Sequence, residues 1–319
     1  MIFDVGLDQI RAAGARVAGK VRVTPSYPSE ALSRRLGREV WLKLEALQDA
    51  GSFKVRGCVN KMSTLTPDEL KRGVVTVSGG NTAIAVAKTA TAFGASSLVL
   101  MPKATPRFNI ALTEANGGVV ELCDDAATAF AVAETHAARG RINIHAYDDP
   151  LMIAGHGTLG LEMAAQAPGL TDVFVSIGGG GFAAGVAAAL KGLDPRIRIW
   201  GVETVGATTM TEAIAAGQPV PIRPTSIAKT LGAPFATERT LAAAKAFLED
   251  IVVVEDRDAV AELVGVLQDE RVLVEPAAAC VVAAAAKVAD RLGPRVGLVL
   301  CGSNVALGDV AAWRDQFGV

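Results

Sequence analysis

The sequence is poor in aromatic residues, cysteine and histidine. Aromatic residues make up 5% of the 319 residues, and there are 4 cysteines and 3 histidines. The cysteines lie far apart, without the paired spacing of a disulfide framework or a zinc motif, at Cys58, Cys123, Cys280 and Cys301. We therefore expect neither kind of site, and we expect a cytoplasmic protein.

An excess of one charge and a long apolar run are also missing. Lysine and arginine number 31 against 33 aspartate and glutamate, a net charge of -2, and no basic stripe stands out. This excludes the usual electrostatic footprint of nucleic-acid and anionic-membrane binding. Charged residues interrupt the apolar positions of residues 1–19, unlike a signal peptide, and no run approaches a membrane span. A small-molecule substrate is the expected partner.

The sequence does contain a regular alternation of strand-like and helix-like segments. Half of the residues are hydrophobic, enough to bury a large core. Alanine-rich or amphipathic segments, typical of helices, follow most of the short apolar runs, which lie at residues 74–77, 97–101, 119–122, 172–177, 197–203, 251–254 and 296–300. Such alternation predicts an α/β fold with parallel sheets and helices on their faces.

A lysine stands at one of the transitions between strand and helix. The stretch Gly51-Ser52-Phe53-Lys54-Val55-Arg56-Gly57 follows the strand-like run 40–45, and residues 59–65 can begin a helix. Most lysines are solvated surface residues. On this stretch alone Lys54 is a candidate functional residue whose role depends on the rest of the chain.

Four consecutive glycines form the second candidate site. Gly178, Gly179, Gly180 and Gly181 lie between the run 172–177 and a helix-like segment. Backbone N–H groups at such a helix start can bind phosphate. The same stretch also satisfies a dinucleotide fingerprint, with Glu203 near the place of a ribose-binding acid, so a nicotinamide-dependent oxidoreductase is an alternative. Ligands sit at strand ends in open α/β sheets, and the turns at residues 78–82, 178–181 and 301–304 are therefore expected to converge.

Taken together and in this order, these motifs resemble those of the fold-type II pyridoxal-phosphate enzymes, the serine/threonine dehydratase and serine racemase group. The resemblance extends over nearly the whole chain and implies the tryptophan synthase β-like fold: two parallel-sheet α/β domains with the cofactor in the cleft between them. It implies a large domain of residues 1–46 and 146–319, and a small domain of residues 47–145 inserted in it. A homodimer is expected.

The resemblance also assigns roles to residues. Lys54 would carry the Schiff base with pyridoxal 5'-phosphate, Phe53 would pack by the ring, and Asn81 would bond the ring oxygen. Gly178 to Gly181 would bind the cofactor phosphate, and Cys301 would face the pyridine nitrogen. The substrate carboxylate would be held by Ser78, Gly79, Gly80, Asn81 and Thr82.

Several details resemble the liver-type serine dehydratase branch. Racemases carry a second serine, a base on the other face, where this chain has Gly79. Cys301 stands where many relatives have serine. Glu203 and the Ala207 carbonyl would help hold a structural cation, and Thr209 replaces the aspartate of magnesium-binding racemases, which favours a monovalent ion such as K+. Thr82 departs from the usual histidine or alanine.

The resemblance thus predicts an ammonia-lyase: β-elimination of a 3-hydroxy amino acid, L-serine or L-threonine, to ammonia and pyruvate or 2-oxobutanoate. A serine racemase or another lyase of this group is one alternative, and a non-catalytic amino-acid-binding protein is another. The roles of two further residues stay open. His156 either orients a loop or fills a polar pocket. Glu275 either lies near the cofactor ring or is an ordinary acid at a helix start.

Overall fold

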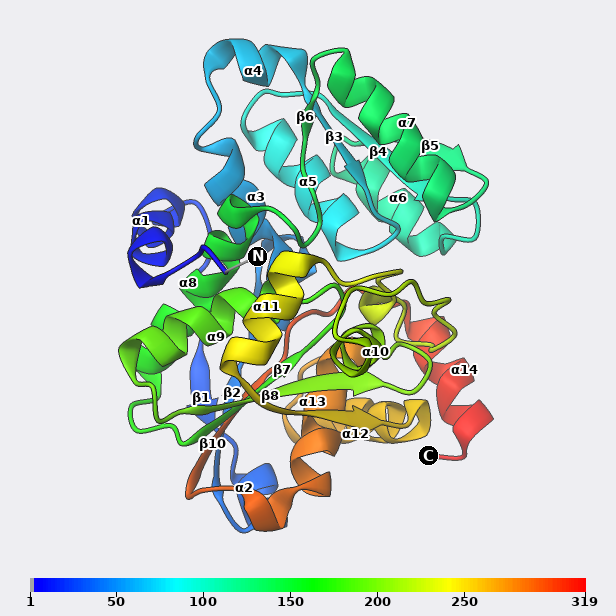
Figure 1. Ribbon diagram of the computed structural model, residues 1–319. Helices are drawn as coiled ribbons and strands as arrows, with labels where there is room; N and C mark the ends of the chain where they lie inside the picture. Colours follow the sequence, from blue (N-terminus) through cyan, green and yellow to red (C-terminus); the bar gives the residue numbers. More distant parts are fainter. Residues whose placement is uncertain (1–2) are drawn as a thin grey trace.

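The computed structural model describes residues 3–319. Its framework is two separate sheets, drawn one above the other in Figure 1. The larger has the order β1-β2-β10-β7-β8-β9 and the smaller the order β5-β4-β3-β6. Only the β1–β2 pair is antiparallel. The predicted fold of two parallel α/β sheets is confirmed.

The large sheet contains strands from the first and the last part of the described chain: β2 and β10 are neighbours in it and pair in parallel. Its strands are β1 Ser26–Pro28, β2 Glu39–Lys43, β7 Asp172–Ser176, β8 Arg198–Thr204, β9 Leu248–Val254 and β10 Arg295–Val299. The small sheet consists of β3 Val74–Val77, β4 Ser97–Pro102, β5 Val119–Cys123 and β6 Ile142–Asn143. The chain thus leaves the large sheet after β2 and returns to it at β7. Domain boundaries at residues 46/47 and 145/146 stay a prediction.

Helices cover both sheets. Those that precede or lie within the small-sheet segment are α1 Leu7–Val17, α2 Glu30–Leu36, α3 Lys54–Met62, α4 Pro67–Arg72, α5 Asn81–Ala92, α6 Arg107–Ala115 and α7 Ala126–Ala138. The later ones are α8 Pro150–Gln166, α9 Gly181–Leu193, α10 Thr209–Ala216, α11 Glu238–Phe247, α12 Asp256–Asp269, α13 Pro276–Lys287 and α14 Leu307–Phe317. Short 3-10 turns are η1 Glu45–Leu47, η2 Asp49–Gly51, η3 Lys229–Leu231 and η4 Ala289–Arg291. In this described part, no helix is both long and apolar enough to span a membrane.

Small side chains bring helix α13 close to the large sheet. Every residue from Pro276 to Ala285 is buried, and most of them are alanine. The helix packs against strands β7 to β10, and α9 lies on the other side of that sheet (Figure 1). Burying apolar surface on both faces gives the large sheet the core that the hydrophobic composition predicts.

A buried ion network fixes the start of helix α3 against the large sheet. The guanidinium of Arg56 donates to Glu45 at 2.7 and 2.8 Å and to Glu162 at 2.7 and 2.8 Å. Lys43 Nζ donates to the same Glu162 carboxylate at 2.7 Å. Arg56, Glu45 and Lys43 are fully buried. The network therefore joins β2, η1, α3 and α8 two residues beyond Lys54.

Removing one partner of this network leaves uncompensated buried charge. We expect Arg56→Ala to lower the free energy of unfolding by about 3–5 kcal/mol, measured by urea denaturation. Arg34→Ala is the matched control, because Arg34 is exposed and lies 3.7 Å from an equally exposed Glu30; it should change stability by less than about 1 kcal/mol. Equal effects of the two substitutions would contradict a stabilising role for the buried network.

Candidate active site

Lys54 is the first residue of helix α3, earlier than the helix start at residue 59 that the sequence suggests. Its Nζ donates to the carbonyl of Ala146 at 2.6 Å and lies 5.1 Å from the centroid of the Phe53 ring. Burial lowers the pKa of Lys54 to about 8, although Cys58 and Cys301 oppose the shift. At neutral pH an appreciable fraction of the amine is therefore unprotonated and able to act as a nucleophile or base.

The four glycines form the turn between β7 and α9, where the backbone of another segment approaches closely. An added Cβ at Gly179 would lie 2.3 Å from the Tyr147 ring, and one at Gly181 would lie 2.3 Å from the Tyr147 carbonyl oxygen. Gly180 has φ +92°, in the left-handed region. Glycine is required here by close approach and by backbone conformation, and the turn ends at a helix N-terminus that can bind an anion.

Residues 78–82 form the turn between β3 and α5. Ser78 Oγ accepts from the Gly80 N–H at 3.2 Å, and the Gly79 carbonyl accepts from Asn109 at 2.8 Å. Asn81 and Thr82 begin α5 and are buried. The side chain of Asn81 reaches across to the large sheet, where its Nδ2 donates to Glu275 at 2.8 Å.

Cys301 lies immediately beyond β10 and is buried. Its Sγ is 3.7 Å from the Ala277 carbonyl oxygen and 3.9 Å from Ser176 Oγ. Burial raises the pKa of the Cys301 thiol well above its ordinary value, and the nearby Glu275 adds to the shift. The thiol is therefore neutral at physiological pH.

Backbone contacts bring these four stretches together. The Phe53 N–H donates to the Cys301 carbonyl at 3.1 Å, and Ser52 pairs with Gly302 in an isolated antiparallel bridge. The Phe53 ring stacks on Phe182, directly after the glycines, with centroids 3.7 Å apart. Because Tyr147 packs on the glycine turn and its neighbour Ala146 accepts from Lys54, one segment contacts both the lysine and the turn. The region where these stretches meet is the place of the predicted cleft.

Residues 17–302 match the profile of the pyridoxal-phosphate dependent enzymes. The chain belongs to this family. It is 35% identical over 302 residues to an L-threonine ammonia-lyase of Geobacter sulfurreducens, covering 93% of this chain and 75% of that protein. It is also 35% identical over 283 residues to the catabolic L-threonine dehydratase of Escherichia coli K12, covering 88% and 86%.

Solved structures of the same fold agree with this assignment. Maize serine racemase superposes with a TM-score of 0.91 at 30% identity, covering 98% of this chain and 97% of that one. A threonine deaminase from T.th. superposes with a TM-score of 0.89 at 32% identity, covering 95% and 99%. The predicted fold, cofactor and enzyme class, a pyridoxal-phosphate dependent ammonia-lyase, are confirmed. The nicotinamide interpretation of the glycine turn is not supported.

The unsatisfied polar groups of the cleft fit such a cofactor. Among residues 3–319, buried side-chain atoms without a hydrogen-bond partner belong to Ser52, Thr89, Ser97, Tyr147, His156 and Glu275. Four of these six residues adjoin the stretches described above: Ser52, Tyr147, His156 and Glu275. Buried polar groups are normally paired, so this concentration marks a place built for a polar ligand. Together with the glycine turn and Lys54, it suits a phosphorylated aldehyde.

His156 lies behind the Phe53 ring. The two rings meet edge to face with centroids 4.9 Å apart, and an added Cβ at Gly57 would lie 2.6 Å from His156 Nε2. Burial lowers the pKa of His156 well below its ordinary value, and the charge of Lys54 acts in the same direction. The imidazole is therefore neutral. It packs against the ring beside Lys54, and the backbone of Gly181 in the glycine turn lies close enough to oppose the shift of its pKa.

The predicted cation ligands are arranged as a helix cap. Glu203 accepts from the N–H groups of Met210 and Thr211 at 2.7 and 3.0 Å, and the Thr209 hydroxyl donates to the Ala233 carbonyl at 2.8 Å. In residues 3–319 no three His, Cys, Asp or Glu side chains are grouped to hold a metal ion. Both carboxylate oxygens of Glu203 already accept hydrogen bonds. The monovalent ion held by Glu203, Ala207 and Thr209 stays a prediction.

Sequence reasoning missed Tyr147 and Thr230. Tyr147 packs on the glycine turn, and Thr230 donates to Glu275 at 2.9 Å. Both lie in segments without regular periodicity, residues 145–149 and 228–232. Their contacts are made across the cleft and are not encoded by local spacing.

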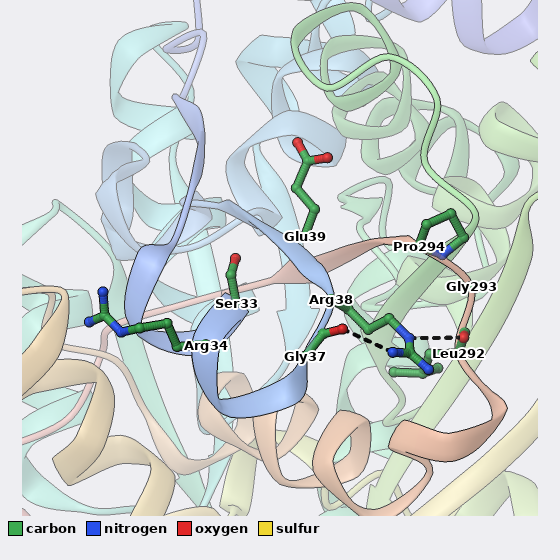
Figure 2. A pocket seen from close by; sticks show the side chains of 8 residues that line it. All are labelled: Ser33, Arg34, Gly37, Arg38, Glu39, Leu292, Gly293 and Pro294. Atoms are coloured by element: carbon green, nitrogen blue, oxygen red, sulfur yellow. Dashed lines mark hydrogen bonds between the residues drawn. The ribbon is translucent and has the colours of Figure 1, made fainter.

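A surface groove lies elsewhere, at the other end of the large sheet. Figure 2 shows Arg38, whose guanidinium donates to the carbonyls of Gly37 and Leu292 at 2.9 and 3.2 Å. The groove adjoins Glu39 and Pro294, at the amino ends of β2 and β10. Ligands of parallel sheets bind at the carboxyl ends, so this groove is not the candidate site.

The glycine turn makes a direct prediction. Gly181→Ala places a methyl group 2.3 Å from the Tyr147 carbonyl oxygen, and we expect it to lower the free energy of unfolding by about 1–3 kcal/mol and to weaken cofactor binding. Gly265→Ala is the matched control: Gly265 lies within α12, and its nearest neighbouring atom would be 3.8 Å from the new Cβ. It should raise stability by about 0.5–1 kcal/mol, measured by urea unfolding. Equal destabilisation by both would refute the crowding argument.

Proposed function

We propose that this chain catalyses pyridoxal-phosphate dependent β-elimination of L-threonine or L-serine, releasing ammonia and a 2-oxo acid. The observation that carries the proposal is the Lys54 amine, whose pKa is lowered to about 8 and which bonds to Ala146, next to the Tyr147 that packs on the glycine turn. The names of the relatives, L-threonine ammonia-lyase and threonine dehydratase, support this reaction.

In this proposal the walls of the cleft hold the cofactor. The N–H groups of Gly178 to Gly181 bind its phosphate, and Asn81 donates to the ring oxygen. Phe53 packs beside the ring, and Cys301 lies at the pyridine nitrogen as a neutral thiol. When bound, pyridoxal phosphate supplies an electron sink for the substrate carbanion.

Lys54 and the turn at residues 78–82 act on the substrate. Ser78, Gly79, Gly80, Asn81 and Thr82 hold its carboxylate near the N-terminus of α5, where backbone N–H groups are unpaired. Lys54 would hold the aldehyde cofactor and, when its amine is free, would accept the Cα proton because its lowered pKa makes it a base near neutral pH. The β-hydroxyl would leave with a proton as water, and hydrolysis of the resulting enamine would release ammonia and the 2-oxo acid.

The structure of the turn supports elimination over racemisation. Gly79 provides no hydroxyl, and a Cβ added there would lie 2.6 Å from Thr105 Oγ1. A serine at this position therefore requires Thr105 to move. Racemisation needs a second base on the opposite face of Cα, and in this proposal position 79 does not supply one.

The catalytic lysine is tested by Lys54→Ala. We expect the purified variant to lose the visible absorption band of the covalently bound cofactor and at least about 10³-fold in ammonia release from L-threonine and L-serine. Lys88→Ala, which changes an exposed lysine of α5, should retain both. A variant at position 54 that keeps the band and the turnover would exclude Lys54 as the cofactor lysine. The wild-type kcat/KM for each amino acid ranks the two substrates.

The cation is tested by thermal unfolding at constant ionic strength. If Glu203 and the Ala207 carbonyl rearrange to bind K+, replacing tetramethylammonium by K+ should raise the Tm by about 2–5 °C. Glu203→Gln should remove this increase, and Glu212→Gln, at an exposed position of α10, should keep it. Identical melting curves in the two salts would refute the cation site.

A cytoplasmic location and a symmetric homodimer complete the proposal. The dimer is the commonest closed assembly of soluble enzymes, and sedimentation equilibrium of the purified protein measures it. An amino acid is the proposed small-molecule partner, and the near-neutral charge balance argues against nucleic acid.

A further inference from the structure

Glu275 immediately precedes helix α13, but its side chain does not cap that helix. The carboxylate instead turns toward the other sheet and accepts two hydrogen bonds on Oε1, from Asn81 Nδ2 at 2.8 Å and from Thr230 Oγ1 at 2.9 Å. It is 3% exposed. Glu275 therefore joins the start of α5 to the turn η3, across the cleft that contains Lys54.

The bond to Glu275 determines how the Asn81 amide is oriented. Asn304 Nδ2 donates to Asn81 Oδ1 at 2.6 Å, so each end of the amide has a partner of the opposite kind. An ionised carboxylate only accepts, and it therefore requires the nitrogen of Asn81 on its side. The second N–H of that nitrogen is left for another acceptor, which in the proposed function is the cofactor ring oxygen.

The other carboxylate oxygen of Glu275, Oε2, is buried and has no hydrogen-bond partner. Among residues 3–319 no lysine, arginine or histidine forms an ion pair with it. The titratable groups around it are the Cys280 thiol on α13, the Cys301 thiol after β10, Lys54 beyond Cys301, and the exposed Lys229 beside Thr230. Burial raises the pKa of both thiols, to about 12 for Cys280, and both are neutral.

Burial without a cation favours the protonated carboxyl. It raises the pKa of Glu275 to about 7, although the bonds from Thr230 and Asn81 and the nearby backbone N–H of Asn304 favour the ionised form. Pyridoxal phosphate is an anion, and its arrival beside a buried carboxylate adds like-charge repulsion, which raises that pKa further. Proton uptake and cofactor binding then favour each other.

We propose that Glu275 is a positioning residue that orients the Asn81 amide and binds one exchangeable proton on Oε2, so that its protonated form binds the cofactor more tightly. The proposal rests on the proposed function, which places Asn81 at the cofactor ring. One proton passes from solvent to Oε2 when the cofactor binds and returns to solvent when it leaves. Cofactor affinity therefore falls as the pH rises through the titration of Glu275.

The test measures the Kd of the apoprotein for 4-deoxypyridoxine 5'-phosphate by equilibrium dialysis over a series of pH values that includes pH 6 and pH 8 and extends above pH 8. This analogue has no aldehyde, so the covalent reaction of Lys54 does not contribute. Titration of its phosphate is common to all variants. In the wild type the Kd should rise between pH 6 and pH 8 by about five- to tenfold more than in Glu275→Gln, whose amide resembles the protonated acid.

Glu255→Gln is the matched control. Glu255 also immediately precedes a helix, α12, without capping it through its side chain, and it is exposed. It should keep the wild-type pH dependence. Isothermal titration in buffers of different ionisation enthalpy should show more proton uptake on analogue binding at pH 8 than at pH 6 in the wild type, and the excess should be absent from Glu275→Gln.

Thr230→Val provides an independent variant if Glu275→Gln does not fold. Losing the hydroxyl bond to Oε1 disfavours the ionised carboxylate, and the midpoint of the wild-type pH dependence should move to higher pH. The same pH dependence in wild type and Glu275→Gln, or an unmoved midpoint in Thr230→Val, would overturn the role of Glu275 and leave the lyase function standing. A wild type that binds no analogue at either pH and releases no ammonia would instead overturn the proposed function.

Discussion

The arrangement of the cleft depends on the buried pairing of Arg56 with Glu45 and Glu162. These charges are fully or largely buried, and leaving one of them unpaired is costly, so the segments that carry them must meet in one geometry. Arg56 lies half a turn beyond Lys54 on α3, and Glu45 lies directly after β2. The same contact that holds the small-sheet segment to the large sheet therefore also fixes where the lysine enters the cleft.

Inside the cleft, in contrast to the fully paired Arg56 network, several buried polar groups have no hydrogen-bond partner in the protein. Desolvation lowers the pKa of Lys54 from 10.5 to about 8 and raises that of Glu275 from 4.5 to about 7. One cause, acting on groups of opposite charge, brings both toward neutral pH. Buried groups with pKa values near neutrality are typical of sites that move protons. Their burial costs free energy, which the surrounding packing and the Arg56 network offset.

Much of the fold and of the candidate site could be predicted from the sequence. What could not be predicted depends on contacts between segments that are distant in the chain. The glycine turn and the strand ends are local sequence patterns. Gly180 has a left-handed backbone conformation and another segment closely approaches Gly181, so both positions need glycine, which the sequence shows directly. The order of motifs then identified the family. The sequence left two alternatives for Glu275, a place near the cofactor ring and an ordinary acid at a helix start. Only the fold shows that it turns away to Asn81, 194 residues distant in sequence.

Tyr147 is a second residue whose contacts could not be predicted from the local sequence. Its ring occupies the space that a side chain at position 179 would need, so an aromatic residue at 147 requires glycine at 179. Tyr147 therefore fills one side of the glycine turn. Nothing in the sequence around either residue indicates this contact. The choice of glycine at residues 178–181 thus reflects two demands at once, the approach of the 146–147 backbone and the exposure of N–H groups at the start of α9. Because the carbonyl of Ala146 also accepts from Lys54, a shift of this segment must alter the glycine turn and the lysine together. In the proposed function this would couple cofactor binding to the position of the base.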